Sequence, residues 1–308
     1  MLSEVTLMIL YVVEGTFVLL TNVPLIFVIY FSRYLRKQRY LTLLGGLCIA
    51  DTLNAVGYLC AGYYRISVSE FAGNHSAVLP QSTCFFKPHV IGLYVGYQTT
   101  SIMTLVVTCE RVFAVFYPTK HMELLNRQFV RLSIVAFVIV FILGSLGGAS
   151  IVEQTQHDLI HIYCYVMASL GETLWSYLLL FRIVNIGISV LLYLLIVWKV
   201  KQMSLTHNSA QRFSRVTITI GLSIASALFC MLIPDLVMYL DPEHFGKYHM
   251  WSYLLGLNKS LLNTFVYMLR HEEIRKALCR ILTNWFPCCS LPKTESSLNN
   301  NNNKPQWL

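Results

Sequence analysis

The sequence predicts an all-α membrane protein: a seven-transmembrane helix bundle with a short cytoplasmic amphipathic helix after the seventh span. Of the 308 residues, 56% are hydrophobic and only 12% are charged, and the mean hydropathy is +0.57. A soluble domain averages about 25% charged residues. A water-soluble chain of this composition would expose much apolar surface, so lipid is the expected solvent. The apolar segments and the placement of basic residues predict the same class.

Seven segments are long and apolar enough to cross a bilayer, which requires about 20 helical residues. They are residues 5–31, 40–64, 84–117, 129–152, 173–199, 213–240 and 248–269. The chain starts with MLSEVT and has no basic residue before its first apolar run, so we expect a retained span rather than a signal peptide. Residues 1–282 are expected to form the membrane domain with its amphipathic helix, and residues 283–308 a disordered cytoplasmic tail.

Basic residues predict the orientation. With seven spans, 18 of the 23 Lys and Arg residues fall in or beside the loops and tail on one side. Such loops are cytoplasmic by the positive-inside rule, which places the amino terminus outside the plasma membrane. The net charge of +8 follows from this topology. No folded basic face with base-reading groups is evident, so we expect no nucleic-acid partner.

Cysteines and a sequon agree with this topology. Asn74 begins a glycosylation tripeptide in the first outer loop. Cys84 at the start of the third span and Cys164 in the second outer loop both face an oxidising compartment, and we expect a disulfide between them. In the tail, Cys288 and Cys289 are either a palmitoylation site or plain reduced thiols.

A charged pair interrupts the third apolar segment. The stretch TCERVFAVFYPTK places Glu110 and Arg111 at the cytoplasmic end of that span. Ionisable residues at such a place indicate function, although an arginine that merely anchors a helix end in the interface is the alternative. Further motifs follow in order along the chain: Asn22 in TNVPLIFVIY, Asp51 in LCIADTL, Pro118 in FYPTK, Pro234 in CMLIPDL, and Asn263 and Tyr267 in NTFVY.

Together these motifs resemble the rhodopsin-like G-protein-coupled receptors. Glu110-Arg111-Val112 stands where that family has acid-Arg-Tyr, and Asn263 to Tyr267 resembles its Asn-Pro-x-x-Tyr with threonine for proline. The chain departs from the family in lacking the tryptophan before Pro234, the helix-four tryptophan and the helix-five proline. Such divergence is similar to nematode serpentine chemosensory receptors, in particular the Srsx-like class.

The resemblance implies a switch mechanism. Arg111 would be held by Glu110 at rest and would face the G protein when helix six swings out. Tyr193 and Tyr267 correspond to the family's switch tyrosines, and Pro234 is either a hinge or a tolerated membrane proline. Residues 211–215, QRFSR, lack the second acid that often clamps the arginine, so we expect measurable basal signalling.

Lys259 stands where the family usually has an asparagine that helps to hold a sodium ion beside Asp51. We expect its ammonium to pair with Asp51 and to replace sodium, because a buried charge needs a partner; a neutral or differently paired lysine is the alternative. Thr100, Ser260 and Asn263 could complete this polar core. The retinal-binding lysine of opsins would fall at Leu257, so no cofactor is expected.

A ligand pocket is expected in the outer half of the bundle. The candidates are His89, Leu93, Tyr94, Tyr97, Gln98, Arg182, Asp235, Tyr239 and Tyr253. Leu93 replaces the aspartate of amine receptors, which disfavours biogenic amines. The aromatic residues could serve packing alone. Arg182 either pairs with Asp235 or anchors a polar or anionic ligand, and Glu14 is either a pocket edge or a paired core charge.

These features predict a chemosensory receptor that couples an extracellular small molecule to a heterotrimeric G protein in a lipid membrane. A neuropeptide-type receptor of the same fold, which would bind a peptide ligand, is the alternative. A channel or transporter would require a polar pore or broken helices in matched halves, and neither is seen. A membrane enzyme would require clustered catalytic or metal-binding groups, whereas the nine histidines are scattered and no His-Glu-x-x-His occurs.

Overall fold

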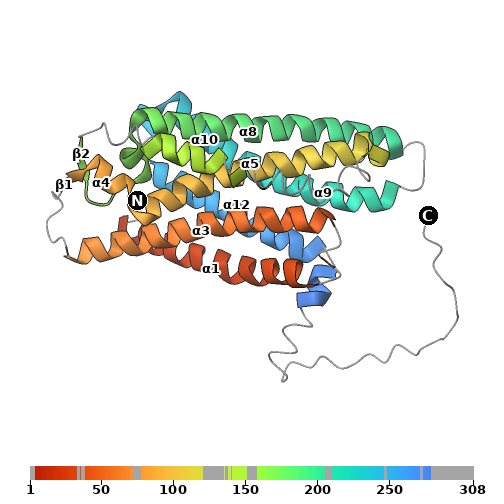
Figure 1. The fold of residues 1–308 in the computed structure, drawn as a ribbon, viewed down its shortest axis with the longest axis horizontal. Coiled ribbons are helices and arrows are strands. Elements are labelled where there is room, and N and C mark those ends of the chain that lie inside the picture. The colour runs from red at the N-terminus through yellow and green to blue at the C-terminus, as the bar shows by residue number, and fades with distance from the viewer. Residues whose placement is uncertain are drawn as a thin grey trace, which may run out of the picture.

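The computed structural model describes residues 4–32, 35, 39–71, 78–120, 135, 138–139, 141–150, 158–204, 210–245, 248–270 and 273–278. The long helices are α1 (Glu4–Phe31), α3 (Arg39–Phe71), α5 (Pro88–Phe116), α8 (Val166–Ser204), α9 (Ala210–Ala227), α10 (Ile233–Leu240) and α12 (His249–Arg270), and a π-helical turn η1 (Leu228–Leu232) joins α9 to α10. The short elements are α4 (Gln81–Phe85), α11 (Pro242–Phe245), β1 (Val78–Pro80) and β2 (Leu159–His161). The long helices lie side by side along the longest axis, and β1, β2 and α4 lie together at one end, called here the outer end (Figure 1).

Among the described helices, five are long and apolar enough to cross a membrane: Val5–Phe31, Leu41–Ser69, Pro88–Phe116, Val166–Gln202 and Ile218–Leu240. A shorter apolar helix, Phe141–Ser150, covers part of the predicted fourth span. The seventh predicted span corresponds to α12, which is less apolar because Asn258, Lys259, Ser260 and Asn263 interrupt it. The helical architecture agrees with the predicted bundle.

Three predicted boundaries are corrected at the outer end. The third span begins at Pro88 rather than at Cys84, because proline suits the first turn of a helix and Cys84 lies in the separate helix α4. The fifth helix begins at Val166 rather than at residue 173, with a break at Gly171 (φ 64°, ψ 171°), where glycine tolerates a positive φ. The second helix continues to Phe71, seven residues beyond its predicted end.

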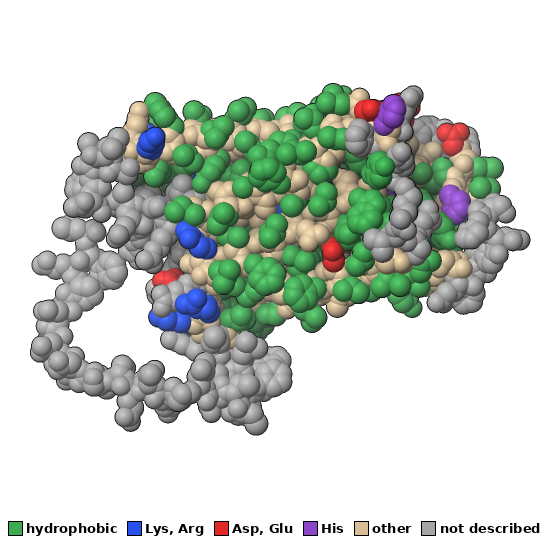
Figure 2. All heavy atoms as spheres, turned by 180° about the vertical axis from the view of Figure 1, so that it is seen from behind, with side chains coloured by type: hydrophobic (Ala, Val, Ile, Leu, Met, Phe, Trp, Pro, Cys, Tyr) green, Lys and Arg blue, Asp and Glu red, His purple; other side chains and the backbone are tan. Residues whose placement is uncertain are grey.

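The surface has the character expected for contact with lipid. Large apolar side chains such as Leu20, Leu191 and Leu194 are exposed, and Figure 2 shows apolar side chains covering most of the long face. Water-soluble monomers rarely expose such extended apolar surface. The visible Lys and Arg side chains gather mainly at the end opposite β1 and β2, called here the inner end (Figure 2).

Helical residues 273–278 follow α12 at the inner end. Ile274 is fully buried against an inner core that includes Ile29, Leu44 and Tyr267, whereas Arg275 and Lys276 are exposed. This segment is therefore amphipathic, as predicted. The predicted tail, Asn74, Cys288, Cys289 and the side chains of residues 211–215 lie outside the described residues.

Candidate functional site

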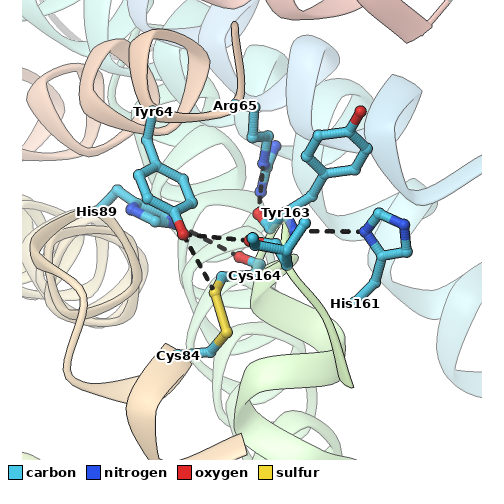
Figure 3. The surroundings of a disulfide bond; sticks show 8 residues. Tyr64, Arg65, Cys84, His89, His161, Tyr163 and Cys164 are labelled. Carbon is cyan, nitrogen blue, oxygen red and sulfur yellow. Dashed lines mark hydrogen bonds between the residues drawn. A yellow bond between two sulfur atoms is a disulfide. The ribbon is translucent and has the colours of Figure 1, made fainter. Parts of the chain in front are cut away.

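The outer loop before α8 is tied down at several points. Cys84 and Cys164 form the predicted disulfide, with their Cα atoms 5.2 Å apart. β1 and β2 pair antiparallel beside it. The Tyr64 hydroxyl donates to the Ile162 carbonyl at 3.1 Å, and Arg65 Nε donates to the Tyr163 carbonyl at 3.2 Å (Figure 3). These contacts attach the loop to α3 and α4 at the outer end of the bundle.

His89, a predicted pocket residue, lies beneath this loop. Its ring stacks on Tyr64 with centroids 4.6 Å apart, and its Nε2 is 3.4 Å from the Cys164 carbonyl oxygen (Figure 3). The structure therefore places His89 next to the disulfide. These contacts indicate that His89 helps to position the outer loop.

Aromatic side chains fill the outer half of the bundle. The hydroxyls of Tyr58 and Tyr97 are hydrogen-bonded at 2.7 Å. The Tyr253 ring packs against both of them and against Trp175, with centroids 6.0 to 6.2 Å apart. Tyr11 joins the cluster through the Tyr58 ring and donates its hydroxyl to the Met250 carbonyl at 2.7 Å.

A buried ion pair lies beside this cluster. Arg182 Nε on α8 is 3.1 Å from Asp235 Oδ2 on α10, with side chains only 5% and 2% exposed. The guanidinium carbon of Arg182 also lies 4.4 Å from the centre of the Tyr97 ring. The fifth and sixth helices are thus linked by charge in the outer half, and Tyr97 stabilises the cation.

Other predicted pocket residues on α5 point elsewhere. The Tyr94 hydroxyl and Gln98 Nε2 both lie 2.8 Å from Ser145 Oγ in the described part of the fourth helix. Leu93 packs so closely on Gly57 of α3 that an added Cβ there would lie 2.9 Å from its backbone nitrogen. Contacts between helices therefore account for these three residues.

A cavity of about 670 Å³ opens at the outer end among α8, α10, α11 and the start of α12. Tyr239 is the one predicted pocket residue among its described lining. The sequence interpretation did not single out Tyr165, Glu172, Trp175, Met238 and His249, which also line it. Their aromatic and polar side chains at the ends of apolar spans were the available signal, but their directions depend on the break at Gly171 and on the path of the loop.

The predicted polar core is assembled around Asp51. Lys259 Nζ is 2.9 Å from Asp51 Oδ1, and both side chains are 1% exposed. Asn263 donates its Nδ2 to Asp51 Oδ2 at 3.1 Å and accepts from Ser226 Oγ at 3.1 Å. Both carboxylate oxygens therefore have a donor, which compensates for the removal of the charges from water.

Three further predicted core residues are buried but do not bond to Asp51. Asn22 accepts a hydrogen bond from the Thr264 hydroxyl, which links α1 to α12. The hydroxyls of Thr100 and Ser260 make no hydrogen bond to any described residue. Burial without a bond to the carboxylate leaves their role a prediction.

The inner end carries the predicted switch residues. Arg111 Nε lies 2.6 Å from Glu110 Oε2, and the side chain of Arg111 remains 13% exposed. Tyr267 is fully buried and accepts a hydrogen bond from Ser223 Oγ at 3.1 Å. The Tyr193 ring lies directly against Gly221 of α9. Pro118 is exposed just beyond α5.

The sixth helix changes its hydrogen bonding just before Pro234. The Ile233 amide bonds to the Leu228 carbonyl, five residues back, within the π-helical turn η1. Proline has no amide hydrogen to give and crowds the preceding turn, so a local departure from α-helical bonding is expected there. This departure separates α9 at the inner end from α10 at the cavity.

A helical bundle with an outer disulfide, a buried charged core and a Glu-Arg pair at its inner end defines a seven-transmembrane receptor. Residues 16–282 match the serpentine type 7TM GPCR chemoreceptor Srsx family, and the chain belongs to that family. It is also 23% identical over 215 residues to the olfactory receptor-like protein OLF4 of Canis lupus familiaris, covering 65% of this chain and 68% of that protein. The predicted family and fold class are confirmed, and the chain is a multi-pass membrane protein of a receptor family rather than an enzyme family.

Proposed function

We propose that this protein is a plasma-membrane chemoreceptor that binds an extracellular small molecule and activates a heterotrimeric G protein. The observation that carries the proposal is the Glu110–Arg111 ion pair at the inner end of α5, in a chain that belongs to a chemoreceptor family. Arg111 is close to the surface, so a partner that offers a better acceptor can reach it with little rearrangement.

The sixth helix connects the outer cavity to the inner end of the bundle. Met238 and Tyr239 of α10 line the outer cavity, whereas α9 extends toward the inner end beyond η1 and Pro234. A ligand that contacts α10 can therefore shift α9, which lies on the other side of η1. Tyr193 and Tyr267 contact α9 and are proposed to hold alternative positions of its inner part.

The cavity supports a small molecule over a peptide. Its volume of about 670 Å³ lies within the usual range for small-molecule sites. The loop fastened by the Cys84–Cys164 disulfide lies at the same end of the bundle. The chain's similarity to a protein named olfactory receptor-like favours the same ligand class.

The proposed orientation places the inner end in the cytoplasm. Lys199, Lys201, Arg270, Arg275 and Lys276 belong to the inner ends of their helices, in agreement with the positive-inside rule. Glycosylation at Asn74 and palmitoylation at Cys288 and Cys289 are compatible proposals. Epitope tags at the two termini should be reached by antibody from opposite sides of an intact cell.

G-protein coupling is tested with an agonist obtained from a screen of volatile and soluble metabolites. Added guanine nucleotide should lower agonist affinity, because binding of the ligand and of the G protein are linked. Arg111→Ala should abolish signalling and this nucleotide effect at equal surface expression. Signalling by Arg111→Ala at the wild-type level would contradict the proposal.

A further inference from the structure

The walls of the outer cavity suit an aromatic molecule. Its lining includes Trp175 and Leu179 of α8, Met238 and Tyr239 of α10, and Tyr165 of the outer loop. Aromatic rings provide large apolar contact area with defined geometry. The walls therefore favour a ligand with a ring over a purely polar one.

Spacing along two helices places the Arg182–Asp235 ion pair about one helical turn from the lining of the cavity, of which neither charged residue is a part. Leu179 precedes Arg182 by three residues on α8, and Met238 follows Asp235 by three residues on α10. Side chains three residues apart lie on the same face of a helix. The faces that line the cavity thus continue inward to the ion pair.

The buried charges of this region do not balance. Arg65 is 1% exposed, and its Nη2 has no hydrogen-bond partner among the described residues. No described carboxylate lies within salt-bridge distance of it. Its guanidinium carbon is 4.6 Å from the centre of the Tyr165 ring, which lines the cavity. Among the described residues, Asp235 is thus ion-paired with Arg182, while the guanidinium of Arg65 has no carboxylate partner, and burying an unpaired charge is costly.

Two further acids among the described residues, Glu14 and Glu172, form no ion pair with either guanidinium. Glu14 of α1 is half-buried and interacts with the side chain of Asn258 on α12, and its Oε2 makes no hydrogen bond to a described residue. Glu172 lines the cavity but is exposed to solvent, where water and salt screen its charge. Among the described residues beside the cavity, the excess positive charge is therefore that of Arg65.

We infer that the cavity binds a small aromatic carboxylic acid, whose carboxylate competes with Asp235 for Arg182. The inference rests on the proposed chemoreceptor function and names the ligand class of that same site. A guanidinium has five N–H donors, so the Nε contact with Asp235 leaves donors for a second carboxylate. An acid neutralises the excess positive charge, whereas an amine increases it.

The first experiment compares head groups on one carbon skeleton. Phenylacetate, phenethyl alcohol and phenethylamine share a ring and a two-carbon chain, and their binding is measured to the purified full-length receptor in lipid nanodiscs without G protein. The acid should bind about 10- to 100-fold more tightly than the alcohol, as expected for a charge-assisted hydrogen bond. No binding of the acid, or equal binding of the amine, would overturn the inference.

The second experiment separates ligand binding from a purely structural ion pair. Arg182→Gln should weaken acid binding about 10- to 100-fold with little change for the alcohol. Asp235→Asn should strengthen acid binding, because it removes the competing carboxylate. A pair that serves packing alone predicts that both variants weaken binding of acid and alcohol alike, and that result would refute the assignment.

Two further variants control this comparison. Arg275→Gln makes the same chemical change at an exposed position at the inner end and should bind the acid as the wild type does. Arg182→Lys keeps the charge and should retain part of the preference for the acid, which provides a test if Arg182→Gln does not yield folded receptor.

The outcomes distinguish this inference from the proposed function. Acid binding without any signalling in cells would remove the proposed coupling and leave the ligand class intact. Signalling driven by another class of molecule, lost in Arg111→Ala and without acid binding, would overturn the ligand class alone.

Discussion

Two buried ion pairs in this bundle differ in how completely they are closed. At Asp51, Lys259 and Asn263 each donate to one carboxylate oxygen, and the charged side chains are 1% exposed. At Asp235, a single Nε contact from Arg182 makes the ion pair, one turn below a cavity. The first pair, called closed here, has a donor on each carboxylate oxygen, whereas the second, called open here, has one described contact and lies about one helical turn from the cavity lining.

The two pairs are expected to differ in what they do: one stabilises the bundle, and the other lies near the ligand cavity. The closed pair joins α3 to α12, and neither of its residues lines the cavity. The open pair joins α8 to α10 beside the Tyr97 ring. Substitutions at the two pairs should therefore differ in the size and kind of their effects.

The largest effect is expected for Lys259→Met. It leaves Asp51 buried without its counter-ion and should lower the free energy of unfolding by about 3–5 kcal/mol. Thermal unfolding of the purified receptor measures the loss. Lys259→Met combined with Asp51→Asn should recover much of it, and a single variant as stable as the wild type would show that the core pair is not a stabilising unit.

A smaller loss is expected for Asp235→Asn. Arg182 retains its contact with the Tyr97 ring, so the free energy of unfolding should fall by about 1–3 kcal/mol. The same unfolding assay compares it directly with Lys259→Met. Equal losses in the two variants would remove the proposed distinction between a closed and an open pair.

Sodium should have little effect on the wild-type receptor. The Lys259 ammonium occupies the position beside Asp51, so exchanging sodium for potassium should change agonist affinity by less than about twofold, below the usual range of allosteric coupling. In Lys259→Asn the carboxylate becomes available to a cation, and sodium dependence should appear. Sodium modulation of the wild type that is lost in Asp51→Asn would contradict the assignment.

The smallest effect is expected for Tyr58→Phe. It removes the hydroxyl contact with Tyr97 but keeps the ring in the aromatic cluster, and should cost about 0.5–1.5 kcal/mol of stability. Agonist affinity and thermal stability are measured together. A loss as large as that of Lys259→Met would mean that the hydroxyl network, rather than the ion pair, holds the core.

The sequence by itself determined the membrane class, because composition and the lengths of apolar segments depend only on the solvent that the chain must satisfy. It also predicted the pairing of Lys259 with Asp51 and the Cys84–Cys164 disulfide. A lone charge in an apolar segment needs a partner, and few residues are available. The positions of Lys259 and Asp51 relative to known motifs placed the two side chains at the same depth in the bundle.

Only the tertiary structure decided which way the side chains face. Tyr94 and Gln98 reach Ser145, and Arg65, a charge near the end of an apolar helix, is fully buried beside the outer loop. A membrane helix is apolar on its lipid face and on much of its packed face, so hydrophobic periodicity does not fix its rotation. The break at Gly171 and the path of the disulfide-bonded loop then determine the cavity, since both depend on contacts between distant parts of the chain.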